Sequence, residues 1–258
     1  MKLKDFDASK EHEVVQQYVR TTRRILFLDY DGTLVPLKRS PDEAIPNPKI
    51  LDQMRRVAAD PRNQVVIVSG RRRQFLDHWF GDIGVTLVAE HGAFLRTPVG
   101  AWTSPVKSEP SWKALLSPVF NRYAHLCQGT FIEEKEYSLA WHYRNAELGE
   151  ARRRRQELKD ELKGLLLPGR RLQILEGHRV MEIKQDGYNK GTAALKLISA
   201  STFDFILAVG DDQTDEDLFR ALPAEAFTFK IGTSPSLARY KLRDPLAVWR
   251  LLDLLGRV

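Results

Sequence analysis

Short apolar runs alternate with helical segments at both ends of the chain. Strands that alternate with helices in this way form a parallel sheet covered on both faces. The continuous apolar runs predict buried strands at residues 25–28, 65–68, 85–89, 205–209 and 227–231. Start signals and apolar spacing predict five helices. The first begins at Asn47–Pro48, the second ends near Phe80, and the third spans about 190–200. The fourth begins at Thr214, and the last runs through Trp249. We therefore predict an α/β protein with a doubly wound parallel sheet.

The middle of the chain breaks this rhythm. It shows a helix, two alternating strands at 130–135 and 137–144, a second helix and two more strands. Strand pairs joined this tightly form antiparallel hairpins. We predict an α+β insert, and turn formers suggest its linkers near 103–111 and 185–189. The predicted organisation is a core of residues 1–105 and 187–258, with the insert at 106–186.

Composition narrows the class of protein. The 258 residues are 43% hydrophobic and 29% charged, which is ordinary for a soluble globular protein. The apolar runs are too short to span a bilayer, and the opening MKLKDFD lacks the apolar stretch of a signal peptide, so we expect no membrane partner and a cytoplasmic location. Cys127 is the only cysteine, which excludes an internal disulfide and a cysteine-rich zinc site.

The excess of basic residues gives little information about the function of the protein. There are 40 Lys and Arg against 34 Asp and Glu, a net charge of +6. The run Arg152–Arg155 lies among acidic residues at helical spacing, as expected of a solvated helix face. No basic stripe with interleaved aromatic residues is visible, so we expect no nucleic-acid partner.

The sharpest chemical feature follows the first predicted strand. In LFLDYDGTL, Asp29 and Asp31 come at the carboxyl end of that strand, and Gly32 allows an abrupt turn. Ligands of open α/β sheets bind at this end. Two such carboxylates can act as nucleophile and proton donor if a cation offsets their repulsion. The alternative is an ordinary turn, in which Asp and Gly are common.

A second strand also ends in acids. Asp211 and Asp212 follow the strand at 205–209, and they would meet Asp29 and Asp31 if the two strands are neighbours. A set of oxygen ligands suits a hard cation such as Mg²⁺. The acids at 215–217 fall in a first helical turn, where they complement the helix dipole, and we interpret them as mainly structural.

Two residues complete a candidate phosphate site. Ser69 closes the strand VVIV before a helix, and Lys190 begins another helix. A hydroxyl beside a helix N-terminus and an ammonium group both bind phosphate oxygens. Each feature is common alone, but their place in a series of strand ends around four acids favours a phosphate site.

These motifs resemble the haloacid dehalogenase superfamily of aspartyl-phosphate hydrolases. The resembling segments are DYDGT, the serine of VSG, the lysine of NKG and GDDQTDED. The resemblance implies that Asp29 is the nucleophile, that Asp31 is the acid and base, and that Ser69 and Lys190 contact the phosphate. It also implies a Mg²⁺ ion held by Asp29, the main-chain carbonyl of Asp31 and Asp211, with Asp212 behind these ligands.

More narrowly, the chain resembles trehalose-6-phosphate phosphatases, through EHG, FIEEKEYSLAWHYRNAEL and GDDQTDEDLF. In that family the insert is a cap over the substrate. Alternation places Ser138, Ala140, His142 and Arg144 on one strand face, and Tyr137, Leu139, Trp141 and Tyr143 on the other. The substrate-binding candidates are Arg71, His91, Glu133, Lys135, Arg144 and Glu182.

Two alternatives stay open for these candidates. The charges of the insert could be the solvated face of an antiparallel sheet, and His91 could be a structural histidine. For Arg144 a direct substrate contact is the less supported of the two interpretations.

The resemblance implies an enzyme that hydrolyses trehalose 6-phosphate to trehalose and phosphate, with a trehalose-phosphate synthase as a further candidate partner. The alternatives are a phosphatase for another sugar phosphate, such as glucosylglycerol phosphate or sucrose phosphate, and a non-catalytic module that binds a sugar phosphate. The presence of all five key residues favours catalysis: Asp29, Asp31, Ser69, Lys190 and Asp211.

Overall fold

The computed structural model describes residues 3–104, 107, 111–166 and 171–258. Packing divides the chain into two compact units, each described here by itself. We call residues 1–105 and 188–258 the core unit, and residues 106–187 the insert unit. No helix among the described residues is long and apolar enough to cross a membrane.

The core unit is built on one mixed sheet. Its described residues form eight strands in the order β1-β12-β11-β10-β2-β3-β4-β5. All pairings are parallel except that of β5 with β4. The strands are β1 (Lys4–Asp5), β2 (Arg24–Asp29), β3 (Asn63–Val68), β4 (Thr86–Ala89), β5 (Phe94–Arg96), β10 (Phe205–Gly210), β11 (Phe227–Ile231) and β12 (Tyr240–Leu242).

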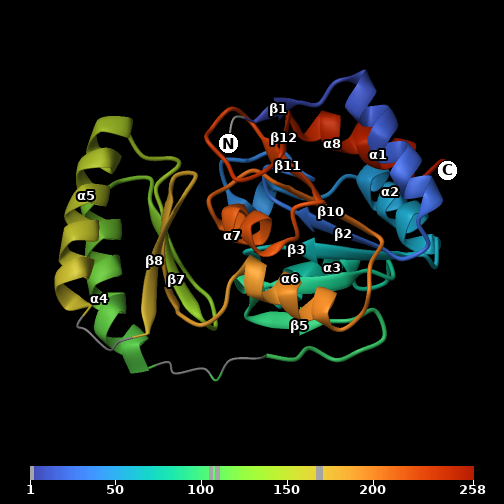
Figure 1. The fold of residues 1–258 in the computed structure, drawn as a ribbon. Helices are drawn as coiled ribbons and strands as arrows, with labels where there is room; N and C mark the ends of the chain where they lie inside the picture. The colour runs from blue at the N-terminus through green and yellow to red at the C-terminus, as the bar shows by residue number, and fades with distance from the viewer. Residues whose placement is uncertain (1–2, 105–106, 108–110, 167–170) are drawn as a thin grey trace. The chain divides into compact units, whose positions relative to one another are not determined.

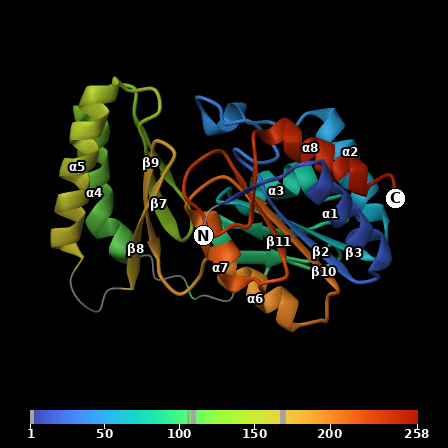
Figure 2. The ribbon, with the colours of Figure 1, turned by 45° about the horizontal axis from the view of Figure 1, so that its top comes forward.

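Helices cover both faces of this sheet (Figure 1). The helices are α1 (Ala8–Arg20), α2 (Pro48–Ala59), α3 (Arg73–Phe80), α6 (Lys190–Ser199), α7 (Thr214–Ala221) and α8 (Pro245–Leu255). Helices α6 and α7 lie on one face, and α1, α2 and α8 gather on the other, as both ribbon views show (Figures 1 and 2). Because β2 is covered on both faces, all six of its residues are buried, as in other central parallel strands.

The predicted α/β class and parallel sheet are confirmed. The prediction missed β1, β12 and β5, which are two or three residues long. Strands this short carry no readable alternation, and they form because an existing sheet edge offers unpaired backbone groups.

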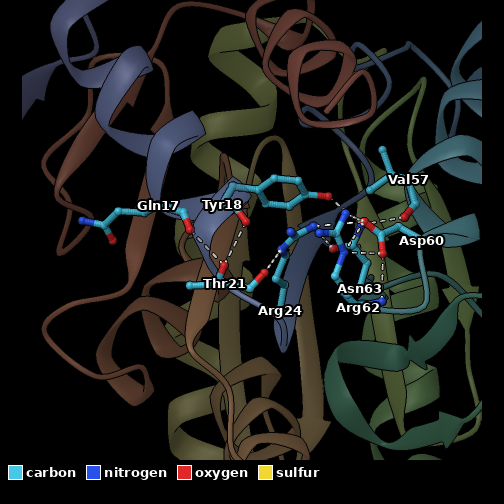
Figure 3. Close-up of polar contacts among 8 residues, drawn as sticks. All are labelled: Gln17, Tyr18, Thr21, Arg24, Val57, Asp60, Arg62 and Asn63. Atoms are coloured by element: carbon cyan, nitrogen blue, oxygen red, sulfur yellow. Dashed lines mark hydrogen bonds and ion pairs between the residues drawn. The ribbon is translucent and has the colours of Figure 1, made fainter.

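A buried arginine ties the elements together at the amino end of β2 (Figure 3). Arg24 donates from Nε to the Thr21 carbonyl at 3.0 Å and from Nη1 to Asp60 Oδ2 at 3.0 Å. Its guanidinium lies 3.9 Å from the centre of the Tyr18 ring. Hydrogen bonds from Arg62 lower the pKa of the Asp60 carboxyl to about 2. Helix α1, strand β2 and the turn before β3 are thereby held at the edge opposite the candidate active site.

The insert unit is an α+β structure. Its described residues form an antiparallel sheet in the order β6-β7-β9-β8, and two helices lie side by side on one face (Figure 1). The predicted alternation is confirmed for the apolar side of β7 and β9, whose residues pack with the helices: Leu139, Trp141, Met181 and Ile183. The elements are α4 (Ser111–Leu126), β6 (Phe131–Glu134), β7 (Ser138–His142), α5 (Leu148–Leu165), β8 (Leu172–Gly177) and β9 (Val180–Gln185).

Two smaller predictions concern the insert unit. On α5 the basic run is matched by acids as predicted, since Arg154 pairs with Glu150 at 2.8 Å and Glu157 at 2.9 Å. Of the linker predicted near 103–111, residues 105–106 and 108–110 lie outside the described residues.

Candidate active site

The carboxyl ends of β2 and β10 bring the first acids together. The two strands are parallel neighbours, with Val209 paired to Leu28, so Asp29 and Asp211 follow at adjacent strand ends. Gly32 turns the chain with φ 81°, a conformation that favours glycine. A Cβ at Gly32 would lie 2.1 Å from Asp211 Oδ2, so no other residue leaves room for that carboxylate.

A buried lysine stands among the acids. Lys190, the first residue of α6, donates from Nζ to Asp29 Oδ1 at 2.6 Å and to Asp215 Oδ1 at 2.8 Å. Burial opposes its charge, but the carboxylates of Asp215 and Asp29 outweigh burial and raise the pKa of Lys190. The structure therefore brings together Asp29 and Asp211, as expected if β2 and β10 are neighbours, and it places Lys190 beside Asp29.

The sequence interpretation treated Asp215 as mainly structural, and the structure places it in the site beside Lys190. It is fully buried, and Oδ2 accepts hydrogen bonds from the backbone N–H groups of Asp211 at 3.1 Å and Asp212 at 3.0 Å. Ligand atoms of Asp29, Asp211 and Asp215 all lie within 4.8 Å of one another. The signal was the spacing of four residues after Asp211, which returns the side chain to the strand end on the first turn of α7.

Two of these acids, Asp29 and Asp211, have raised pKa values. Burial raises the pKa of Asp29 to about 7, helped by the nearby Asp215 carboxylate and opposed by Lys190. Burial also raises the pKa of Asp211 to about 9, and the charges of Asp29, Asp215 and Asp212 add to the shift. Like charges in a buried site favour the neutral form until a cation compensates them.

The donor set fits a hard divalent cation. The three acids offer only oxygen ligands, the kind that Mg²⁺ and Ca²⁺ prefer. Oδ2 of Asp29 is buried and has no hydrogen-bond partner among the residues that the structure describes. An orphaned buried carboxylate oxygen is costly without a ligand. The carboxylate of Asp31 is not part of this group.

Asp31 faces an arginine instead. Arg71 donates from Nε to Asp31 Oδ2 and from Nη2 to Asp31 Oδ1, both at 2.7 Å. The guanidinium also lies 4.5 Å from the centre of the Phe75 ring. Two parallel hydrogen bonds fix both side chains in orientation.

One more residue supports the turn of Asp211 and Asp212, which we call the acidic turn. Lys230 on β11 was missed: it is buried and donates from Nζ to the carbonyls of Asp211 at 2.6 Å and Asp212 at 3.2 Å. Asp212 itself accepts the Gln213 N–H at 2.7 Å through Oδ1, and it is not among the three clustered acids.

Ser69 lies in a turn that a second turn supports. Its Oγ accepts the backbone N–H of Arg71 at 3.1 Å. The η2 turn (Glu90–Gly92) lies against it, and both Glu90 (φ 47°) and His91 (φ 58°) adopt left-handed conformations. Such conformations cost about 1–3 kcal/mol each and persist where the surroundings impose them.

The insert unit carries a separate cluster of charges. Lys135 Nζ donates to Glu182 Oε1 at 3.2 Å, and His142 Nε2 lies 3.0 Å from Glu133 Oε2. Burial works to raise the pKa of Glu133, but Lys135 and His142 outweigh it and lower the pKa to about 2. His142 was not among the predicted site residues, although alternation placed it on this face. Arg144 donates to the His178 carbonyl at 2.8 Å.

Comparisons with known proteins identify the family of this chain. The family model described as trehalose-phosphatase matches residues 27–246. The bifunctional trehalose-6-phosphate synthase/phosphatase of Thermoproteus tenax is 43% identical over 236 residues, which are 92% of this chain and 32% of that protein. The chain thus spans about a third of the length of the curated relatives it matches.

Solved structures show the same architecture. The C-terminal domain of trehalose-6-phosphate phosphatase from C. albicans superposes with a TM-score of 0.91 at 27% identity, over 96% of this chain and 97% of that one. A haloacid dehalogenase-like hydrolase from B. subtilis superposes with a TM-score of 0.62 at 13% identity, over 89% of this chain and 98% of that one. The second likeness concerns the fold, and it confirms the predicted haloacid dehalogenase-like core. With the family model matching most of its length, the chain belongs to the trehalose-phosphatase family.

Proposed function

We propose that this protein is a Mg²⁺-dependent phosphatase that hydrolyses trehalose 6-phosphate to trehalose and phosphate. The observation that carries the proposal is the buried group of Asp29, Lys190, Asp211 and Asp215 at the carboxyl ends of β2 and β10. It combines a nucleophile, a fixed positive charge and oxygen ligands for a cation. The family of the chain supplies the substrate class.

Each residue of the site has its own role in the proposed hydrolysis. A carboxylate oxygen of Asp29 attacks phosphorus, the bond from phosphorus to the sugar oxygen breaks, and Asp31 gives that oxygen its proton. Asp31 then takes a proton from the water that attacks the aspartyl-phosphate, which releases phosphate and restores Asp29. Lys190 and Ser69 stabilise charge on the transferred group.

Mg²⁺ would be held by Asp29 and Asp211, with the Asp31 carbonyl, and when bound it supplies positive charge to the transferred phosphoryl group. Asp215 orients the Asp211–Asp212 backbone and Lys190. The ion pair between Arg71 and Asp31 must open before Asp31 can transfer a proton, and the arriving phosphate gives Arg71 a competing partner.

The insert unit supplies the sugar contacts in this proposal. Glu133, Lys135 and Glu182 offer charged donors and acceptors whose geometry is already fixed by their mutual contacts. Sugar hydroxyls are bound by such preorganised polar groups. Glu133 keeps its charge over the physiological range because its pKa is low, so it acts as a hydrogen-bond acceptor.

The test is phosphate release from purified protein. We expect turnover of trehalose 6-phosphate with Mg²⁺, loss of turnover after chelation, and recovery when Mg²⁺ returns. A panel with glucose 6-phosphate, sucrose 6-phosphate and glucosylglycerol phosphate measures selectivity through kcat/KM. A higher kcat/KM for another sugar phosphate would show that this compound is the substrate. If no phosphoester releases phosphate, the protein is a non-catalytic module that binds a sugar phosphate.

A partner is a further part of the proposal. The relative from Thermoproteus tenax is named as both synthase and phosphatase, and it is about three times as long as the matched region. We infer that a trehalose-phosphate synthase supplies the substrate of this chain. Co-purification with a synthase, with a lowered steady-state level of free trehalose 6-phosphate in a coupled reaction, would support this partner.

A further inference from the structure

Two turns are joined beyond the ends of β3 and β4. The His91 N–H donates to the Ser69 carbonyl and the Glu90 N–H donates to the Arg71 carbonyl, both at 2.9 Å. The strands themselves end at Val68 and Ala89. These bonds therefore extend the pairing of the sheet into the turn that carries Ser69 and Arg71.

The ring of His91 covers Gly70 in the middle of that turn. A Cβ built on Gly70 would lie 2.4 Å from Cε1 and 2.5 Å from Nε2 of His91, closer than Cβ atoms approach other atoms. Gly70 is not among the glycines with positive φ. The backbone at Gly70 would accept alanine, so the His91 ring is what demands glycine there.

The same turn contacts the start of α6. A Cβ at Gly92, where φ is 111°, would lie 2.5 Å from the Asn189 carbonyl oxygen. Asn189 is the N-cap of α6, whose first residue is Lys190. The η2 turn thus lies against both the turn of Ser69 and the helix start that carries Lys190.

We propose that His91 is a positioning residue, whose ring and backbone hold the turn from Ser69 to Arg71 in register with Lys190. The left-handed conformations of Glu90 and His91 fit this role, because strained backbone is kept where the surrounding contacts impose it. The inference rests on the proposed phosphatase function and deepens it. It differs from the interpretation of His91 as a sugar ligand, since His91 acts here through Gly70.

If His91 positions this turn, the effect of Gly70→Ala on kcat depends on whether the His91 ring is present. Gly70→Ala displaces the ring and the turn, and a misplaced catalytic group costs rate. We expect kcat to fall about tenfold or more for Gly70→Ala in the natural background. In the His91→Ala background the ring is gone, and adding Gly70→Ala should change kcat by less than about twofold.

The experiment compares four proteins: the natural chain, Gly70→Ala, His91→Ala and the double variant. Each is assayed with Mg²⁺ on trehalose 6-phosphate and on p-nitrophenyl phosphate, which has no sugar. Circular dichroism at the assay temperature confirms that each variant is folded, so a difference in kcat is not a loss of folded protein. An equal effect of Gly70→Ala in both backgrounds, or none in the natural one, overturns the inference.

The control is Gly164→Ala on α5, where a Cβ meets no atom within 4 Å, and we expect unchanged kcat. If Gly70→Ala does not fold, His91→Gly and His91→Ala decide the question. Both remove the ring, while glycine relieves the left-handed strain at this position. We expect a lower kcat on p-nitrophenyl phosphate in both variants than in the natural chain. The melting temperature of His91→Gly should be higher than that of His91→Ala. An unchanged kcat in both variants overturns the inference.

The outcomes separate the two proposals. If the natural chain hydrolyses p-nitrophenyl phosphate but not trehalose 6-phosphate, the proposed substrate is wrong. The dependence of the Gly70→Ala effect on the His91 ring can still be measured with p-nitrophenyl phosphate. A natural chain active on both without coupling overturns the role of His91 alone. Inactivity on both substrates overturns both.

Discussion

Asp29 is held between burial, which favours its neutral form, and the Lys190 ammonium 2.6 Å away, which favours its charged form. The result is a carboxyl that loses its proton near neutral pH. As the nucleophile of the proposed function, a carboxylate with this pKa is more basic than an exposed aspartate. The cost of burying it is offset by one fixed cation and, in the proposed function, by Mg²⁺.

Asp29→Asn should keep the fold and lower kcat by at least about a thousandfold, because an amide cannot form the acyl phosphate. The measurement is phosphate release, with circular dichroism as the check of folding. Asp217→Asn is the matched control: Asp217 lies on α7 and pairs with the exposed Arg220, and we expect unchanged kcat. Activity of Asp29→Asn near that of the control would contradict the nucleophile.

Lys230→Met should destabilise the protein by about 3–5 kcal/mol, because it leaves the buried Glu216 and two carbonyls without their cation. Lys241→Met is the control, since its ion pair with Asp5 is largely exposed and worth about 0–1 kcal/mol. Urea unfolding measures both. Similar losses in the two variants would show that Lys230 does not support the acidic turn.

At the scale of elements, α6 links a helix cap to the site. Asn189 forms a capping box with Thr192, in which the Asn189 side chain accepts the Thr192 N–H and the Thr192 hydroxyl accepts the Asn189 N–H. The next residue is Lys190, so the cap holds the backbone from which the Lys190 side chain starts. Helix capping usually contributes to stability alone, but this cap lies next to a residue that binds the phosphoryl group in the proposed function.

Asn189→Ala should therefore lower both stability, by about 1 kcal/mol, and kcat. Asn47→Ala is the matched control: Asn47 caps α2 in the same way through the Ile50 N–H, away from the site. We expect a similar loss of stability and unchanged kcat there. Thermal unfolding and phosphate release distinguish the two, and unchanged kcat for Asn189→Ala would mean that Lys190 is positioned by its ion pairs alone.

At the scale of the whole molecule, the net charge is +6, although the candidate active site contains a cluster of acidic residues. The pKa values of Asp29 and Asp211 are raised to about 7 and 9 without metal. At these two carboxyls the folded state binds more protons than the unfolded one between about pH 4 and 9, so their contribution to the stability of the metal-free protein falls as pH rises through this range. A bound cation competes with those protons.

Mg²⁺ should therefore bind more tightly as pH rises from 6 to 9, with proton release on binding. The increase in melting temperature caused by Mg²⁺ should be larger at pH 8.5 than at pH 6, as measured by calorimetry. Asp211→Asn serves as the control, since it removes a titrating ligand and should weaken both the shift and its pH dependence. A shift independent of pH would contradict protonated acids in the metal-free site.

Much of this architecture could be read from the chain. The buried strands were recognisable because parallel strands covered on both faces are continuously apolar, and the sheet then placed Asp29 and Asp211 at one edge. The strands β1, β5 and β12 could not be recognised, because their pairing depends on sheet edges formed by the rest of the chain. The insert was visible as a change from helix-strand alternation to hairpins.

The sequence by itself determined the fold class, the family resemblance and the residue types at the ends of the strands, since local periodicity and motif spacing encode these. Only the tertiary structure decided that Asp215 points back to Lys190, that Lys230 donates to the Asp211 carbonyl, and that Arg71 pairs with Asp31. Such contacts depend on side-chain directions and on packing between distant segments, to within a few tenths of an ångström. Local patterns carry no information at that precision, because they reflect which face of an element is buried and not what it meets there.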